Sequence, residues 1–520
     1  MNNSQEFFYY QPRYRSFAER KTTFLNTNKG RLLEFVAKRT KMVACHNIWE
    51  AHNLNKINWI KKHELYSSKI DDKITIIYEN LNLKRLIFFE VIDIDYFEKF
   101  RKIAISKFIN NPDYLGLTKK DDIIKELSNM EDRFEWISRG RLFYNNLNKK
   151  RNNNNDLIES VGCRYIKTNE SYFILCFEVN LSDFTNKIFE KIIRQKDTSA
   201  EIPQYHSFFT IITKKMFISR YHYLPSLKVE NIRNLIRDIN FQVKHNYTKY
   251  FNGYFHNSKL FRLLPSIEYY EVNDIHLFNA DHNLSSNFRT NCSTYFSSED
   301  ELSEIHWSFS NEKGQELLQV VKQNNKKLFD SNNDMEDFEA HALLNSLSFS
   351  CVFSAILKEH NFQLKKLKRK VYDQIKQSKR NYFLRLFRII GINNKYLKLK
   401  QDLINIQLTI NRFENEFSNE KIILYTRGFD LNNFKLHNPY PNEQKNFLTY
   451  SIKNFRFRLG KLESGTKKIN EIFKIYEEYN AYKTNLFLQI SSLIFAIIAI
   501  FFAFDKTKDF LFRIFQIIFH

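Results

Sequence analysis

Six small or polar residues recur at steps of four and three near the C-terminal end of the sequence. Leu, Ile and Phe fill most of the positions between them. This spacing places the six on one face of a helix: Asn485, Gln489, Ser492, Ala496, Ala499 and Ala503. Because lipid offers an amide no hydrogen-bond partner and small side chains let helices approach closely, this stripe is expected to face protein or water.

Two interpretations of this stripe stay open. If several identical helices met along it, Asn485 and Gln489 would form amide rings at the cytoplasmic mouth of a pore, and Ser492 and the alanines would line a narrow conduit. Alternatively, the same face would serve only to associate membrane anchors into a dimer or trimer without conduction. The helix alone favours neither.

The stripe lies in a candidate membrane helix. Residues 486–504 carry no charge, with Lys483 before them and Asp505 after them, and nineteen helical residues can span about 30 Å of hydrocarbon. The alternative is a buried core helix, which seldom carries so long an uncharged run. We predict a transmembrane helix.

The expected topology is a single pass through the cell (inner) membrane with the N-terminal bulk in the cytoplasm. Four lysines precede the span (Lys467, Lys468, Lys474 and Lys483), and the N-terminus shows no signal-peptide pattern. The eleven residues 510–520 are too short to span and are interrupted by Arg513, which predicts an interfacial or partly inserted arm.

Composition limits the function classes. With 43% apolar residues, 27% charged residues, 10 Gly and 7 Pro in 520 residues, the chain is neither disordered nor collagen-like. Its net charge of +22 favours an anionic partner. Five separated cysteines without a Cys-x-x-Cys pair suggest neither a disulfide framework nor a zinc ribbon, as expected in a reducing cytosol.

Much of the positive charge is concentrated in one helical stretch. Residues 358–400 hold fourteen Lys and Arg against only Glu359 and Asp373. We predict contact with lipid headgroups or another anionic ligand for Lys365, Lys366, Lys368, Arg369, Lys370, Arg385 and Arg388. Interleaved aromatics would also suit nucleic acid, but a membrane anchor argues against that partner. A solvated basic face is the simplest alternative.

The expected fold is an α/β cytoplasmic domain followed by a long-helix bundle or stalk and a C-terminal transmembrane helix. Four regions are predicted: an N-terminal α/β region (1–156), a second α/β region with a hairpin (157–337), a helical bundle and stalk (338–484) and the membrane segment (485–520).

The hydrophobic pattern places the elements of these regions. Strands are expected at 74–78, 86–92, 172–179, 207–213 and 216–223. Helices are expected at 96–108, 183–195 with Ser182 as cap, 229–249, 338–357, 358–400 with a break near Gly391, and from about 441 to 504. An apolar seam recurs at steps of three and four from Leu364 to Ile410. The stretch 250–340 shows no clear pattern apart from a turn at 297–301.

Two segments and the order of elements resemble the CorA-like family of divalent-cation channels and transporters. The hairpin FTIITKKMFISRYHYLP is similar to the strand-turn-strand before that family's first large helix. The stretch YNAYKTNLFLQISSLIFAI looks like its stalk-to-pore junction, where an Asn precedes an apolar helix with Ser or Thr. The resemblance covers about residues 170–520 and implies a homo-oligomer that passes Mg²⁺ or another cation, with no further cofactor.

The chain departs from this family at two places. The family's Gly-Met-Asn signature is absent, and Ala503-Phe504-Asp505 stands in its place; the second membrane helix would be the short FLFRIFQIIFH. Since the signature loop holds the hydrated cation at the entrance, the resemblance implies the architecture rather than the ion selectivity.

Other chemistry finds little support in the sequence. The groups His46, Glu50, His52 and Asp274, His276, Asp281, His282 are weak metal candidates, and no phosphate loop or nucleophile elbow is present. We therefore expect no enzyme. The alternative to a channel is a tail-anchored sensor, triggered by a small molecule or protein, whose membrane segment depolarises its own cell, for example in antiviral defence.

Overall fold

The computed structural model describes residues 81–109, 121, 124, 140–146, 157–168, 172–193, 199–201, 221–276, 294–298, 300, 302–310, 315–323, 336–380, 389–416, 431–436, 446–503 and 505–519. The chain divides into two compact units. We call the first, Met1–Glu359 with Asn415–Arg456, the sheet unit. The second, His360–Glu414 with Phe457–His520, is the helical unit.

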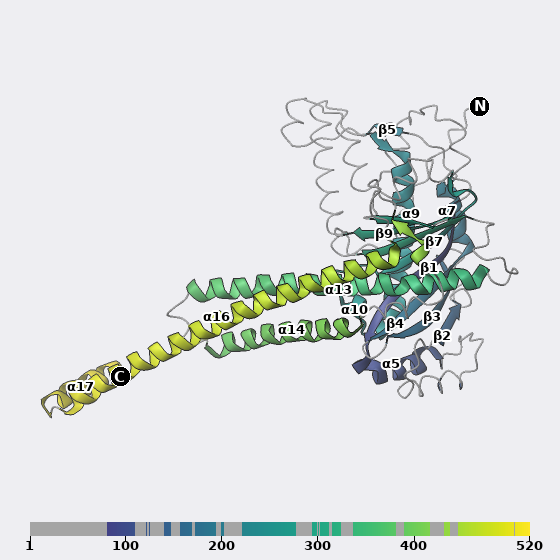
Figure 1. Cartoon of the computed structure of the whole chain (residues 1–520). Helices are drawn as coiled ribbons and strands as arrows, with labels where there is room; N and C mark the ends of the chain where they lie inside the picture. Colours follow the sequence, from purple (N-terminus) through teal and green to yellow (C-terminus); the bar gives the residue numbers. More distant parts are fainter. Residues whose placement is uncertain are drawn as a thin grey trace, which may run out of the picture. The chain divides into compact units, whose positions relative to one another are not determined.

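A nine-stranded mixed sheet organises the sheet unit (Figure 1). Its strands, in spatial order, are β11 (Lys435–Leu436), β8 (Thr294–Ser297), β9 (Ser303–Ser310), β10 (Gln315–Gln323), β7 (Ser266–Val272), β1 (Asn82–Asp93), β4 (Tyr172–Leu181), β3 (Ile158–Thr168) and β2 (Gly140–Asn146). Neighbours are antiparallel except β10 and β7, which pair in parallel.

The central strands are apolar because both of their faces are covered. Every residue of β1 from Leu86 to Ile92 is buried, as are Tyr172–Phe177 of β4. On one face, Tyr247 packs against Phe177 and Phe189 against Tyr270. The strands predicted at 86–92 and 172–179 are confirmed.

Four helices of the sheet unit come between these strands along the chain: α5 (Phe97–Ile103), α7 (Asp183–Ile193), α9 (Leu224–Asn246) and α10 (Tyr254–Asn257). The predicted cap of α7 is confirmed, because Ser182 Oγ accepts the Thr185 amide at 3.2 Å. Helix α9 begins five residues earlier than the predicted 229, with Pro225 in its first turn, where a missing N–H costs nothing.

Several observations differ from the sequence-based expectation. The stretch 250–340, which showed no clear pattern, contributes β7 to β10, because these strands bury polar residues such as His306 and Glu316 that disguise the alternation. The boundary placed at 156 does not separate two sheets, since β1 and β2 before it and β3 and β4 after it are neighbours in one sheet. The strands expected at 74–78 and 207–213 lie outside the described residues.

The predicted hairpin at 207–223 is described only at its end. Tyr221–Tyr223 form β6, which pairs antiparallel with β5 (Ser199–Glu201) in a separate two-stranded sheet. The turn expected at 297–301 is confirmed, since the Ser298 hydroxyl accepts hydrogen bonds from the backbone amides of Leu302 and Ser303.

Four long helices supply the helical unit: α13 (Glu336–Arg380), α14 (Ile389–Glu416), α16 (Phe447–Ala503) and α17 (Asp505–Phe519). Helices α13 and α16 start in the sheet unit. The break expected near Gly391 is wrong: α13 ends at Arg380 and Gly391 lies inside α14, where one glycine costs a helix only about 1 kcal/mol.

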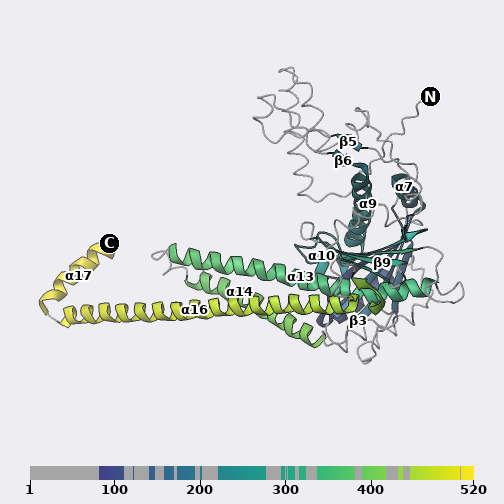
Figure 2. The ribbon, with the colours of Figure 1, turned by 45° about the horizontal axis from the view of Figure 1, so that its top comes forward.

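The predicted apolar seam is buried. Leu364, Leu367 and Val371 of α13 and Leu399, Leu403, Ile406 and Ile410 of α14 are each less than 10% exposed. Within the helical unit, α13, α14 and α16 lie side by side (Figures 1 and 2). Lys400 of α14 donates to Glu477 of α16 at 2.8 Å, and Leu364 of α13 lies against Gly465 of α16.

Candidate functional site

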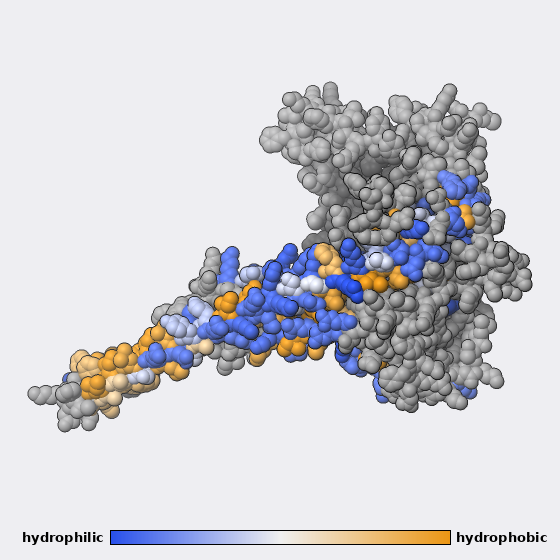
Figure 3. All heavy atoms as spheres, in the orientation of Figure 1, coloured by the Kyte–Doolittle hydropathy of each residue, from blue (hydrophilic) through white to orange (hydrophobic). Residues whose placement is uncertain are grey.

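The apolar end of α16 is the strongest functional candidate. Among the described helices, α16 alone is long and apolar enough to cross a membrane. Its most apolar eighteen residues are entirely unburied. A core helix would bury such a segment, whereas Phe495 is 71% exposed. Figure 3 shows this hydrophobic surface at the end of the helix.

The structure places the predicted stripe on a continuous helix. Asn485, Gln489, Ser492, Ala496 and Ala499 are all exposed, and Ala503 is the last residue of α16. Within the described part of this chain, no side chain covers the first five. Large apolar residues such as Phe487, Ile490 and Ile494 take up the opposite face at the same helical spacing. An exposed amide face beside an apolar face needs a partner in a bilayer.

The predicted basic residues lie elsewhere. Lys365, Lys366, Lys368, Arg369 and Lys370 are exposed on α13, with Lys368 Nζ 5.9 Å from the Tyr372 ring; Arg385 and Arg388 lie outside the described residues. Leu364 lies against Gly465, twenty residues before Asn485. Because α13 runs in the same direction as α16 (Figures 1 and 2), about 20–30 Å of helix separates this basic group from the stripe. The structure does not bring the two together.

The sequence analysis missed a buried carboxylate in the middle of the sheet. Glu90 of β1 accepts the amides of Val91 at 2.9 Å and of Phe255 and His256 at 2.7 Å. Desolvation outweighs these hydrogen bonds and raises the pKa of Glu90 to about 7. A signal was present, since Glu90 is the one charge in the apolar run LIFFEVI.

Lys244 of α9 completes this cluster. Its Nζ donates to the carbonyls of Phe255 at 2.9 Å and Phe261 at 2.7 Å. Burial lowers the pKa of Lys244 to about 8, opposed by the negative charge of Glu90. Together the two charged groups fasten α10 and the segment after it onto β1, so their role is structural.

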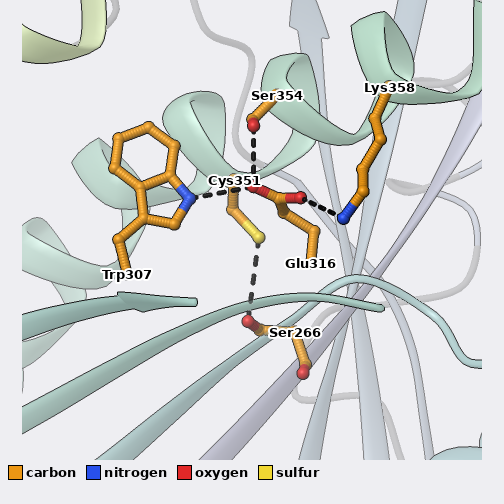
Figure 4. A network of polar contacts seen from close by, with 6 residues as sticks. All are labelled: Ser266, Trp307, Glu316, Cys351, Ser354 and Lys358. Atoms are coloured by element: carbon orange, nitrogen blue, oxygen red, sulfur yellow. Dashed lines mark hydrogen bonds and ion pairs between the residues drawn. The ribbon is translucent and has the colours of Figure 1, made fainter. Parts of the chain in front are cut away.

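A second buried carboxylate attaches α13 to the sheet (Figure 4). Glu316 of β10 accepts Trp307 Nε1 at 2.9 Å and Ser354 Oγ at 2.7 Å, and its other oxygen lies 3.5 Å from Lys358 Nζ. Beside it, Cys351 Sγ donates to the Ser266 carbonyl at 3.7 Å. All donors to Glu316 come from β9 and α13, so this network positions the helix.

The first turns of α16 pack on the same face of the sheet. Phe447 stacks on Trp307 with ring centroids 5.4 Å apart and meets Phe296 edge-on at 5.0 Å. Two turns further on, Phe455 meets Phe353 of α13 at 6.4 Å. The helix that carries the apolar segment is therefore anchored in the sheet unit by aromatic contacts.

The described residues contain no group of three or more His, Cys, Asp or Glu side chains placed to hold a metal ion. Asp274 accepts the His276 amide at 2.8 Å in an exposed turn, which is the loop geometry expected of Asx residues. The remaining weak metal candidates, His46, Glu50, His52, Asp281 and His282, lie outside the described residues.

Comparison with known proteins identifies no relative: no protein-family model matches the chain, and no curated protein matches it significantly.

Proposed function

We propose that the chain is a CorA-like, homo-oligomeric membrane protein that forms a cation channel or transporter. The observation that carries this proposal is the form of α16. One unbroken helix of 57 residues begins on the sheet and ends in an uncharged, unburied segment with a polar stripe. At 1.5 Å per residue it is about 85 Å long, enough for a stalk followed by a membrane span.

The stripe supports assembly of several copies. In a lone membrane helix Gln489 and Ser492 would face hydrocarbon, where an unpaired amide or hydroxyl is costly. Copies of the same helix that meet along this face satisfy those groups with one another or with water. Amide and hydroxyl oxygens around an axis can replace part of the hydration shell of a cation.

The order of elements supports the CorA-like architecture. A sheet-containing unit comes first, α13 and α14 follow, and the long α16 leads into the apolar segment. In this proposal the sheet unit lies in the cytoplasm at the cell (inner) membrane, and α13, α14 and α16 form a stalk above the span. Mg²⁺ or another cation is the transported ion.

Flux from liposomes reconstituted with the full chain tests the proposal. The variant Gln489→Leu with Ser492→Leu makes the stripe apolar and is expected to reduce Mg²⁺ and K⁺ flux at least tenfold. The matched control Ile490→Leu with Ile494→Leu also introduces two leucines, but on the opposite face, and should retain flux. Assembly is followed by light scattering. Absence of flux for every cation, or equal loss in both variants, contradicts the channel.

The second candidate is a tail-anchored sensor whose membrane segment depolarises the cell after a small-molecule or protein trigger. Helix α17 favours it: its 15 residues extend only about 22 Å, short of the roughly 30 Å of a bilayer core. Because the Gly-Met-Asn signature is also missing, a non-selective pore has more support than an ion-selective channel. In that case the full chain should cause growth arrest and dye-reported depolarisation when expressed, and the chain without residues 486–520 should cause neither.

A further inference from the structure

Two contacts determine how far along α16 each residue of α14 lies. Lys400 donates to Glu477, and Glu414 shares a side-chain hydrogen bond with Glu463. Fourteen residues separate each pair along its own helix, so α14 runs antiparallel to α16 in constant register. The N-terminal part of α14 therefore approaches the apolar segment, and Lys395 and Lys398 lie at the level of Tyr482 and Tyr479.

One contact and the direction of α13 determine how far along α16 each residue of α13 lies. Leu364 lies against Gly465, and α13 runs in the same direction as α16 (Figures 1 and 2). Its last residue, Arg380, is sixteen residues further on and lies at the level of residue 481. Lys376 lies at the level of Glu477 and Lys379 at the level of residue 480. The end of α13 thus reaches almost to Leu486, where the apolar segment begins.

These levels separate the basic residues into two groups. Measured along α16 to Leu486, Lys395 and Arg380 lie about 6 Å and 8 Å away and Lys376 about 14 Å, whereas Lys370 and Lys365 lie about 22 Å and 30 Å away. Headgroups add about 5–7 Å to each side of the hydrocarbon core. Since charges are screened over about 8 Å at physiological ionic strength, only the nearer group can interact strongly with a membrane surface.

The nearer group has the composition of a headgroup contact. From Gln374 to Gln401 the sequence contains no Asp or Glu. Lys376 and Lys398 are exposed, and the described residues offer neither an ion-pair partner. Lys400 is excluded because it pairs with Glu477. On α16 at the same level, Tyr479 and Tyr482 are 42% and 65% exposed, which is the aromatic content expected at a membrane interface.

We propose that the ends of α13 and α14 nearest Leu486 form a membrane-proximal basic surface that binds anionic phospholipid headgroups of the cytoplasmic leaflet. Lys376 and Lys398 are its exposed side chains, and Lys379, Arg380 and Lys395 belong to it by their positions along the two helices. The inference rests on the proposed function, because it requires that α16 enters a membrane near Leu486. If α16 enters the membrane there, the residues of the earlier expectation lie about 22–30 Å along α16 from Leu486, beyond the reach of the headgroups: Lys365, Lys366, Lys368, Arg369 and Lys370.

The chain supplies its own matched control. One variant changes the five residues of the membrane-proximal basic surface to Gln, and the other changes Lys365, Lys366, Lys368, Arg369 and Lys370 to Gln. Both remove five positive charges, and Gln has a helix propensity close to that of Lys and Arg. Circular dichroism and the oligomeric mass confirm that each variant folds and assembles as the parent does.

Binding of phosphatidylglycerol and phosphatidylcholine to the full chain in detergent is measured by native mass spectrometry. The membrane-proximal variant is expected to lose at least tenfold in phosphatidylglycerol affinity with no change for phosphatidylcholine. The distant variant should stay within twofold of the parent. Equal losses in both variants, or no loss in either, overturn the proposal.

Two further measurements separate this inference from other outcomes. Resistance of the chain to alkaline carbonate extraction reports membrane insertion, so failure there contradicts the proposed function, whereas insertion without phosphatidylglycerol preference contradicts only the inference. A labelled oligouridylate probe tests nucleic acid. If that probe binds the membrane-proximal basic surface more tightly than phosphatidylglycerol, the surface serves RNA and the lipid assignment is overturned.

Discussion

Leu364 of α13 occupies the space beside Gly465 of α16, so that a Cβ atom at position 465 would collide with the Leu364 side chain. Gly460, five residues earlier on the same helix, has nothing within 4 Å of such an atom. Helix α16 passes through both glycines without a break. Gly465 therefore allows two helices to approach closely, whereas Gly460 makes no such contact.

The two glycines should respond oppositely to alanine. Gly460→Ala is expected to stabilise the chain by about 1 kcal/mol, the gain in helix propensity at an exposed site. Gly465→Ala gains the same propensity but crowds the buried Leu364, so it should be less stable than Gly460→Ala by about 1–3 kcal/mol. Thermal unfolding in detergent measures the difference. Equal midpoints would show that Leu364 yields without cost.

Removal of the Glu316 carboxylate should destabilise the attachment of α13 to the sheet. Glu316→Ala removes the carboxylate that Trp307, Ser354 and Lys358 contact, at an expected cost of about 3–5 kcal/mol. Ser354→Ala removes one donor and should cost about 1–2 kcal/mol. Denaturant unfolding monitored by tryptophan fluorescence tests both. A Glu316 variant no worse than the serine variant would contradict the network.

Glu90 should make stability depend on pH. Burial raises its pKa from 4.5 to about 7, so the folded chain binds the proton more tightly than the unfolded chain. This contribution is fully present below pH 4.5 and is lost as the pH rises through 7, by up to about 3 kcal/mol. The pKa of Lys244 is lowered to about 8, so that group acts above this window.

The measurement is the unfolding midpoint of the parent and of Glu90→Gln at pH 5, 6 and 7. Because Gln does not titrate, the parent should lose stability relative to the variant as the pH rises. His256, whose pKa is lowered by burial and by the charge of Lys244, is present in both proteins. A constant difference over this range would mean that Glu90 keeps its ordinary pKa.

Assembly along the stripe can be tested by cross-linking. In a background with Cys45 and Cys292 changed to serine, the remaining cysteines, Cys163, Cys176 and Cys351, are buried. Ser492→Cys is expected to form disulfide-linked dimers under copper phenanthroline, since identical residues on a shared face meet at a symmetry axis. Ile494→Cys on the opposite face is the control. Equal cross-linking of both would point to random collision.

Local patterns were sufficient wherever burial follows the period of the element. The sequence predicts the strands at 86–92 and 172–179 correctly because both faces of those strands are buried and apolar. It predicts the seam from Leu364 to Ile410 correctly because one face of each helix is apolar. The pattern fails in β9 and β10, where Glu304, His306 and Glu316 are buried beside hydrophobic residues. Their partners lie on other strands and on α13, which a local window does not contain.

What the sequence by itself determined is the uncharged segment after Lys483, the stripe from Asn485 to Ala503 and the concentration of lysine and arginine between 358 and 400. Composition and helical spacing suffice for these, since they involve neighbours on one helix. Only the tertiary structure decided the strand order, the acceptor role of Glu316 and which cations lie near the apolar segment. The last depends on Leu364 meeting Gly465 and Lys400 meeting Glu477, contacts between residues 77 or more positions apart that set how far one helix slides along another.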